Sequence, residues 1–170
     1  MKNIILVGFM GTGKTTIAAK LSHRLKMNYI SIDDLIQKKE NRTINEIFTK
    51  SGEDYFRNVE SEIVRDVAEM ENAVVDTGGG VVLREQNMDL LSANGTVICL
   101  TAEPEVIMER TKKYKHRPLL NVEDPKRKIM EMLKTRAPFY AKAKYSIDTG
   151  ALTVRQVVEK IAEIAEGAKG

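Results

Sequence analysis

Short apolar runs and longer segments of helical periodicity alternate along this chain. The apolar runs predict buried β-strands at 4–8, 28–31, 73–76, 96–100 and 145–148. The segments between them carry apolar side chains at spacings of three and four residues, as amphipathic helices do. Strands of this kind separated by helices are typical of a parallel sheet covered on both faces. The pattern therefore predicts an α/β fold of three layers around a five-stranded parallel sheet.

Several helix ends can be placed from capping and proline signals. Thr43 followed by Glu46 fits a capping box, which predicts a helix start. Asn94-Gly95 predicts a helix closed by glycine directly before the fourth strand. We expect the helix that reaches Pro138 to bend or end there, because proline lacks the N–H that a helix interior needs.

Size and charge narrow the functional classes. The chain has 170 residues, which suggests one domain over 1–170. Its net charge of +3 is too small to indicate a nucleic-acid partner, although a basic cleft for a small anion would fit it. Cys99 is the single cysteine, which excludes an internal disulfide and favours a reducing cytoplasm. No apolar stretch approaches the roughly 20 residues of a membrane span. We therefore expect a cytoplasmic monomer that binds a small molecule, without nucleic acid or membrane.

The segment GFMGTGKT, residues 8–15, follows the first strand, opens a helix and matches the phosphate-binding pattern G-x-x-x-x-G-K-[ST]. Its glycines let backbone N–H groups turn towards phosphate oxygens, and the helix N-terminus adds a positive dipole end. Lys14 would place its charge on the β and γ phosphates, and Thr15 would offer its hydroxyl to Mg²⁺. We predict that the protein binds ATP and Mg²⁺. The predicted nucleotide-binding residues of this loop are Gly11, Thr12, Gly13, Lys14, Thr15 and Thr16.

Two features distinguish among the classes of P-loop protein. The N-K-x-D motif with which GTPases recognise their base is absent from the sequence. A basic segment without clear periodicity, 111–124, predicts a mobile loop of about a dozen residues, and such a loop in a compact domain is often functional. We interpret it as a lid. Both features favour a small kinase of the nucleoside-monophosphate-kinase type.

Five further motifs follow the phosphate-binding loop in order. They are YISIDDLI (29–36), INEIFTKSGEDYFRNVE (44–60), TGGGVV (77–82), RPLL (117–120) and RAPFY (136–140). In order and spacing the set resembles the shikimate kinase family over nearly the whole chain. The combination is specific, whereas the P-loop alone is shared by many families. The resemblance implies a P-loop kinase fold with a mobile lid, which uses ATP to phosphorylate the 3-hydroxyl of shikimate and yields shikimate 3-phosphate and ADP.

The resemblance also implies roles for individual acceptor-site residues, in a helical region of about 33–61 and beyond it. Asp33 would bind the reacting hydroxyl, either as a base or as a group that orients it. Arg57 and Arg136 would grip the substrate carboxylate, which a planar guanidinium suits better than a lysine does. The substrate ring would be lined by Gly78, Gly79 and Gly80.

The lid would complete the nucleotide site. Arg117 would swing in to the phosphates and act as a catalytic residue together with Lys14 and Asp33. Arg110 and Pro118 would border the adenine.

Two positions depart from the family pattern, and both concern the metal. The family's F-x-D-x-D segment has Ser31 in place of its first aspartate, which the resemblance places near Mg²⁺, while Asp33 keeps the second. Asp76 stands before T-G-G-G, where the family usually has a small or apolar residue. The third strand of such folds is expected beside the first, so Asp76 would face Thr15. We hypothesise that Asp76 takes over the metal role; the alternative is that it only caps the glycine turn.

The sequence leaves the two arginines and the acceptor open to more than one interpretation. Arg57 could form an ordinary surface ion pair with Glu60 one turn on, and Arg136 could be solvated. A related small-molecule kinase, such as one acting on gluconate, would share the P-loop and lid without needing both arginines. A non-catalytic ATP-binding regulatory module belongs to a different functional class, and the change at Ser31 is the feature that favours it.

Overall fold

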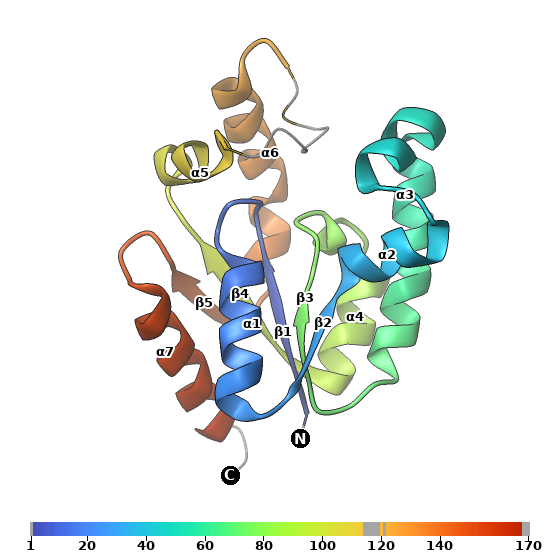
Figure 1. Ribbon diagram of the computed structural model, residues 1–170. Coiled ribbons are helices and arrows are strands. Elements are labelled where there is room, and N and C mark those ends of the chain that lie inside the picture. Colours follow the sequence, from blue (N-terminus) through green and yellow to red (C-terminus); the bar gives the residue numbers. More distant parts are fainter. Residues whose placement is uncertain (1, 114–119, 121, 168–170) are drawn as a thin grey trace.

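The computed structural model describes residues 2–113, 120 and 122–167, which form a parallel sheet with helices on both faces (Figure 1). The strands are β1 (Asn3–Gly8), β2 (Asn28–Ser31), β3 (Ala73–Asp76), β4 (Gly95–Thr101) and β5 (Tyr145–Asp148). Their order in the sheet is β2-β3-β1-β4-β5, and all neighbours run parallel. The predicted fold class is confirmed, and each of the five strands ends within one residue of its predicted position.

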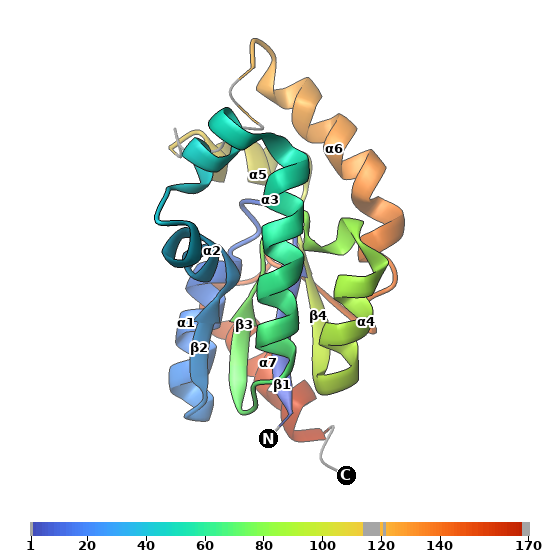
Figure 2. The same ribbon diagram turned by 90° about the vertical axis from the view of Figure 1, so that its right-hand side faces the viewer.

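The helices divide between the two faces of the sheet. They are α1 (Lys14–Leu25), α2 (Ile32–Glu40), α3 (Ile44–Ala68), α4 (Glu85–Asn94), α5 (Pro104–Thr111), α6 (Pro125–Tyr140) and α7 (Val154–Gly167), with one 3-10 turn, η1 (Val81–Leu83). α3 and α4 lie on one face, towards the viewer in Figure 2, and α1 and α7 lie on the other. None of these helices combines the length and apolarity that a membrane crossing needs, as far as the chain is described.

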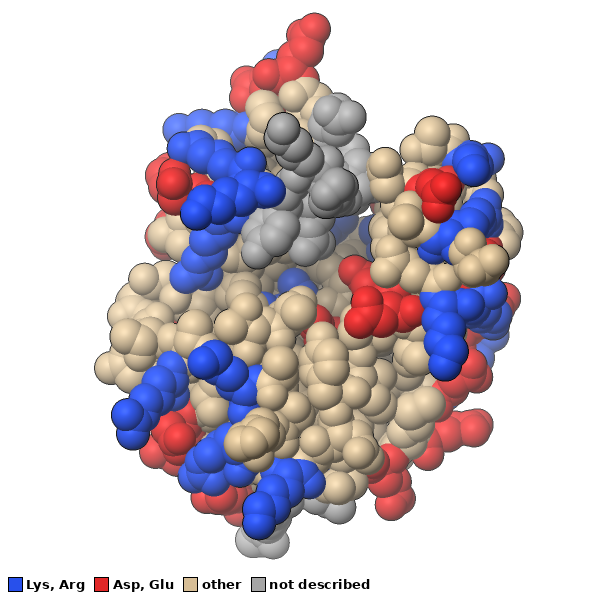
Figure 3. All heavy atoms as spheres, viewed as in Figure 1, with Lys and Arg blue, Asp and Glu red and all other residues tan. Residues whose placement is uncertain are grey.

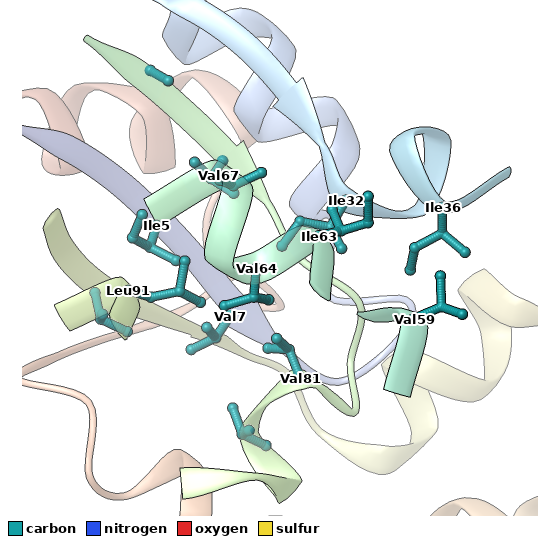
Figure 4. Close-up of a cluster of buried hydrophobic side chains, with 14 of the residues drawn as sticks. Ile5, Val7, Ile32, Ile36, Val59, Ile63, Val64, Val67, Val81 and Leu91 are labelled. Carbon is teal, nitrogen blue, oxygen red and sulfur yellow. The ribbon is translucent and has the colours of Figure 1, made fainter. Parts of the chain in front are cut away.

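Alternate residues of β1 enter two separate cores. Ile5 and Val7 pack with α3 and α4 (Figure 4), whereas Ile4 and Leu6 pack with α1 and α7. Successive side chains of a strand point to opposite faces, so a strand covered on both sides must be apolar at every position. This explains why the ILV run of β1 shows no alternation.

A third apolar cluster lies above the carboxyl end of the sheet. It joins Phe9 and Met10 of the phosphate-binding loop to Ile107 of α5 and Ile129 of α6. Burying these side chains holds α6 over the loop. The carboxyl ends of parallel strands are where ligands bind in open α/β sheets, so α6 borders the region where a site is expected.

The helix ends confirm two of the predicted signals, and the third differs in part. Thr43 Oγ1 accepts from the Glu46 N–H at 3.1 Å and Glu46 Oε2 accepts from the Thr43 N–H at 2.9 Å, as a capping box requires. α4 ends at Asn94 with Gly95 directly before β4, as predicted, although Gly95 does not adopt a left-handed conformation. Its backbone is extended, with φ −156°, and its glycine identity is explained by β1, because a Cβ there would lie 2.9 Å from the Asn3 carbonyl oxygen.

The third signal is Pro138, where α6 was expected to bend or end. The helix does not end at Pro138 but continues to Tyr140. A proline this close to the carboxyl end removes one intrahelical bond only, and the Ala141 N–H still donates to the Ala137 carbonyl at 3.0 Å. Arg136 and Tyr140 therefore lie four residues apart on one helix, on the same side.

Candidate active site

A cavity of about 690 Å³ opens at the carboxyl ends of β1, β2 and β3. It is lined by the phosphate-binding loop, the first turn of α2, the middle of α3, the turn 77–80 and Arg136 of α6. Figure 3 shows the surface hollowed between the α2–α3 region and the part that carries α5 and α6. Acidic side chains gather on the α2 side of this hollow, where Asp33 and Asp34 occupy the first helical turn.

The phosphate-binding loop has the backbone that its glycines allow. Gly8, Gly11 and Gly13 have φ of 143°, 79° and 95°, a region that residues with a Cβ rarely adopt. α1 begins at Lys14, so its N-terminal N–H groups face the cavity. Lys14 Nζ donates to the carbonyls of Gly8 at 2.7 Å and Phe9 at 3.0 Å, which holds the ammonium inside the loop. The loop therefore concentrates backbone donors and a positive charge where a phosphate group would lie.

Asp76 lies at the end of β3 and faces this loop. Thr15 Oγ1 donates to Asp76 Oδ2 at 2.7 Å, and the Tyr29 hydroxyl donates to the same oxygen at 3.3 Å. Burial, followed by the charge of Asp76, raises the pKa of Tyr29 to about 12, so the phenol keeps its proton. The strand register pairs Ser31 of β2 with Asp76 of β3. The carboxylate thus stands one strand away from the position at which the sequence lacks an aspartate.

The donor set around Asp76 suits Mg²⁺. Hydroxyl and carboxylate oxygens are the ligands that this ion prefers, and it usually keeps several waters while bridging to phosphates. In the described part of the chain, no group of three or more His, Cys, Asp or Glu side chains forms a metal-binding cluster. A metal in this cavity would therefore be shared between a few protein oxygens and the nucleotide.

Arg57 is buried on α3 and forms an ion pair inside the protein. Its Nη1 donates to Glu60 Oε1 at 2.8 Å and its Nη2 to Glu53 Oε1 at 3.3 Å. Arg57 is 7% exposed and Glu60 is 0% exposed, so the surface ion pair considered from the sequence is wrong. Burial raises the pKa of Glu60, and the charge of Arg57 opposes this shift. Arg57 Nε and Glu60 Oε2 have no hydrogen-bond partner among the described residues. One donor and one acceptor thus remain for a ligand beside the cavity.

Arg136 reaches the same cavity from α6. It is 4% exposed, so it is not the solvated charge that was the alternative. Its guanidinium lies over the Phe9 ring, 5.6 Å from the ring centre, a distance at which a cation is attracted to the aromatic face. The Tyr140 hydroxyl, one helical turn on, donates to the Gly79 carbonyl. Burial raises the pKa of Tyr140 to about 12, against the charge of Arg136, and so preserves this donor.

The two guanidinium groups lie against consecutive residues of the glycine turn 77–80. A Cβ on Gly80 would lie 2.2 Å from Arg57 Nη2, and a Cβ on Gly79 would lie 3.3 Å from Arg136 Nη1. Both side chains therefore rest on neighbouring stretches of bare backbone. The predicted lining of a substrate ring by Gly78, Gly79 and Gly80 stays a prediction; all three line the cavity, and the missing side chains of Gly79 and Gly80 also make room for the arginines.

Gly78 does the same for two acidic side chains. A Cβ there would lie 3.1 Å from Glu60 Oε2 and 3.2 Å from Asp33 Oδ1. Asp33, in the first turn of α2, thus meets Glu60 of α3 at the turn. At this turn the cavity brings two guanidinium groups together with the carboxyl groups of Asp33 and Glu60, next to the phosphate-binding loop. Such a set can hold a small molecule that carries one carboxylate and several hydroxyls.

Arg110 lies beside the phosphate-binding loop. Its Nη1 donates to the Gly11 carbonyl at 3.2 Å, and its Nη2 donates to the Thr149 carbonyl at 3.0 Å. It therefore ties α5 to the loop and to the end of β5. The other predicted lid residues, Arg117 and Pro118, lie outside the described residues.

Three residues of the site were not predicted in these roles. Tyr140 closes the R-x-P-x-Y motif, and its spacing of four from Arg136 was a signal that it shares that side of the helix. Glu60 was considered only as a partner of Arg57, but it is buried and lines the cavity. Nothing in the sequence by itself indicated that Tyr29 would contact Asp76.

Comparison with known proteins decides the family. Residues 10–166 match the family model described as shikimate kinase. The chain belongs to the shikimate kinase family. The shikimate kinase of Thermoanaerobacter pseudethanolicus is 47% identical over 161 residues, which cover 95% of this chain and 94% of that protein. The shikimate kinase of Thermodesulfovibrio yellowstonii is 45% identical over 161 residues, with 95% and 93% covered.

Solved structures agree with this membership. A shikimate kinase from Acinetobacter baumannii in complex with shikimate superposes with a TM-score of 0.95 at 36% identity, covering 99% of this chain and 95% of that one. A gluconokinase from Sinorhizobium meliloti 1021 has a TM-score of 0.65 at 17% identity, covering 99% and 95%, which shows a shared fold alone. The family and the class of enzyme predicted from the motifs, a shikimate kinase, are confirmed.

Proposed function

We propose that this member of the shikimate kinase family uses ATP to phosphorylate the 3-hydroxyl of shikimate, giving shikimate 3-phosphate and ADP. One observation carries the assignment of residues. Arg57 of α3 and Arg136 of α6 lie against consecutive glycines and line one cavity with the phosphate-binding loop. Two fixed guanidinium groups beside a triphosphate site suit an acceptor that carries a carboxylate and is phosphorylated elsewhere on its ring.

In this proposal the acceptor is held from two sides. Arg57 and Arg136 bind its carboxylate, and Phe9 supports Arg136 from below. Asp33 and Glu60 accept from ring hydroxyls, because both approach the turn at Gly78. This places the reacting hydroxyl at Asp33 and the carboxylate at the opposite end of the molecule.

The chemical step requires positioning and charge neutralisation above all. The 3-hydroxyl oxygen of shikimate attacks the γ phosphorus, and the bond from that phosphorus to the bridging oxygen of ADP breaks. Asp33 either removes the hydroxyl proton or aligns the hydroxyl until the proton leaves. Lys14 exchanges its carbonyl partners in the loop for phosphate oxygens, and Arg117 of the lid (about 111–124) adds a second cation there.

We assign the metal to Thr15 and Asp76, with Mg²⁺ as the ion. The Thr15 hydroxyl donates a hydrogen bond to Asp76, so a lone pair of its oxygen can turn to the ion. Asp76 would hold a water of the ion rather than the ion alone, in place of the aspartate missing at Ser31. When bound, Mg²⁺ neutralises charge on the transferring phosphoryl group.

The remaining assignments concern the nucleotide and the state of the protein. The nucleotide phosphates bind to the loop residues Gly11, Thr12, Gly13, Lys14, Thr15 and Thr16. Arg110 and Pro118 border the adenine, and Arg110 already lies next to Gly11. We further propose a single kinase domain over 1–170 with an acceptor region at about 33–61, acting as a monomer in the cytoplasm.

An ADP-release assay with three acceptor conditions tests the activity. Shikimate should support turnover far above the rate without acceptor, whereas gluconate should not, because it offers no rigid ring to place between Asp33 and Arg136. Turnover with gluconate alone would indicate the related small-molecule kinase. ATP binding without turnover in any condition would indicate the regulatory module.

The metal assignment has its own test. Asp76→Asn should raise the Mg²⁺ concentration needed for half-maximal rate by roughly 10- to 150-fold, because losing a charge-assisted bond costs on the order of 1.5–3 kcal/mol. Asp66→Asn, at an exposed position of α3, serves as the matched control and should change nothing. Unchanged Mg²⁺ dependence and turnover in Asp76→Asn would reduce Asp76 to a cap of the glycine turn.

A further inference from the structure

The position of Arg57 relative to the glycine turn depends on how α3 is held against that turn. The two belong to separate segments, and the guanidinium has little freedom because the Gly80 backbone lies directly against it. A shift of α3 by a fraction of an ångström would move the cation that the proposed function assigns to the shikimate carboxylate. Something must therefore fix the register between helix and turn.

Arg84 makes that connection. It is the one residue between η1 and α4, and it reaches back to α3. Its Nη1 donates to the Arg57 carbonyl at 3.0 Å and to Ser61 Oγ at 3.1 Å, and its Nη2 donates to Asn58 Oδ1 at 2.8 Å. These three bonds hold the helical turn that carries Arg57.

The other end of the connection is equally well defined. The Val81 N–H donates to the Gly78 carbonyl at 3.2 Å, and the Leu83 N–H donates to the Gly80 carbonyl at 3.1 Å. The glycine turn, η1 and Arg84 thus form one hydrogen-bonded unit. Because Arg84 is hydrogen-bonded to α3, it also fixes the position of the glycine-turn backbone that contacts Arg57.

We propose that Arg84 is a positioning residue for the acceptor site, which sets the place of the Arg57 guanidinium without touching the substrate. Arg84 does not line the cavity. Its effect should therefore fall mainly on shikimate, because the phosphate-binding loop connects β1 to α1, whereas the bonds of Arg84 go to α3. This inference rests on the proposed function in one respect, the binding of shikimate by Arg57.

Arg84→Met tests the proposal, since methionine keeps much of the length and loses all three donors. The Kd and KM for shikimate should rise about tenfold, because small misplacements of a binding group cost one to two orders of magnitude. The Kd for ATP should stay within about twofold, which a general loosening of the fold would not allow. Arg84→Lys, which can still reach the Arg57 carbonyl, should recover part of the loss.

A double-mutant cycle separates positioning from a purely structural role. In an Arg57→Ala background, Arg84→Met should weaken shikimate binding by less than about twofold, because the group it positions is gone. Arg24→Met, which removes an exposed ion pair with Glu159 on the far side of the molecule, is the control and should leave both affinities unchanged.

The outcomes are distinguishable from a failure of the proposed function. If the wild-type protein does not bind shikimate, the proposed function is wrong and this inference falls with it. If the wild type binds shikimate and Arg84→Met lowers shikimate and ATP affinity equally, or has its full effect without Arg57, then Arg84 is only a structural link. An unchanged shikimate Kd in Arg84→Met would also overturn the inference.

Discussion

Replacing Gly80 with alanine displaces Arg57 while leaving every polar group of the site in the chain. The new Cβ would lie 2.2 Å from Nη2, 2.4 Å from Cζ and 2.5 Å from Nη1 of Arg57. The backbone itself tolerates alanine, because Gly80 has φ −98°. The guanidinium must therefore retreat by roughly 1.3 Å to reach the ~3.5 Å of ordinary contact. That movement stretches its 2.8 Å bond to Glu60, which is fully buried.

Two measurable losses follow from this displacement. Weakening a buried charge-assisted bond costs on the order of 2 kcal/mol of unfolding free energy, which lowers Tm by about 4–8 °C in a chain of this length. Misplacing one of two carboxylate-binding cations costs about 2–3 kcal/mol of acceptor binding, or roughly 30- to 150-fold in Kd. The KM for ATP should stay within about twofold, since the nearest contacts of Gly80 belong to Arg57 and not to the loop.

Steady-state kinetics with each substrate varied in turn, together with thermal unfolding, checks these numbers. Gly167→Ala is the matched control, because a Cβ there meets nothing within 4 Å. In an Arg57→Ala background Gly80→Ala should add almost nothing, since the clash is gone. If Gly80→Ala leaves the shikimate KM unchanged, or raises the ATP KM as much, the turn does not act through Arg57.

Three further predictions concern the metal region and the buried acid. Ser31→Asp added to Asp76→Asn should recover most of the lost Mg²⁺ affinity, because the two positions are register partners across β2 and β3; no recovery would separate them. Tyr29→Phe should weaken Mn²⁺ binding to the complex with a non-hydrolysable ATP analogue by a factor of about three, since one long bond to a charged group is lost, and unchanged Mn²⁺ affinity would contradict this. Burial raises the pKa of Glu60 above 4.5, so the folded state binds the extra proton and stability falls as pH rises from that value through the folded pKa. Glu60→Gln should flatten this part of the curve of unfolding free energy against pH, and parallel curves for the two proteins would exclude Glu60 as the titrating group.

The strands were predictable because a parallel sheet buried on both faces requires apolar residues at consecutive positions. Ile4 and Ile5 illustrate this, since they enter opposite cores and both must be apolar. The end of α4 at Asn94-Gly95 was also predictable. The close approach of β1, which leaves no room for a Cβ on Gly95, is revealed only by the assembled sheet.

The motifs predicted which residues line the site. They did not predict the tertiary contacts that hold those residues in place. The motifs pointed to Arg57 and Arg136, and the fold brings them together. The contact of the three glycines with a substrate ring stays a prediction, and only the fold reveals that they also accommodate side chains from three other segments. Arg84 carried no signal at all, because its partners on α3 lie 23 to 27 positions away along the chain.

In the proposed function Arg57 and Arg136 jointly bind the carboxylate of shikimate, and calorimetric titration with shikimate and with its methyl ester is the sharpest test of this pairing. The ester keeps the ring and hydroxyls and removes the negative charge. We expect wild-type protein to bind the ester at least about 100-fold more weakly than shikimate, and we expect this ratio to fall to within about threefold when both arginines are replaced by methionine. Equal binding of acid and ester by the wild type, or a ratio that survives in the double variant, would contradict it.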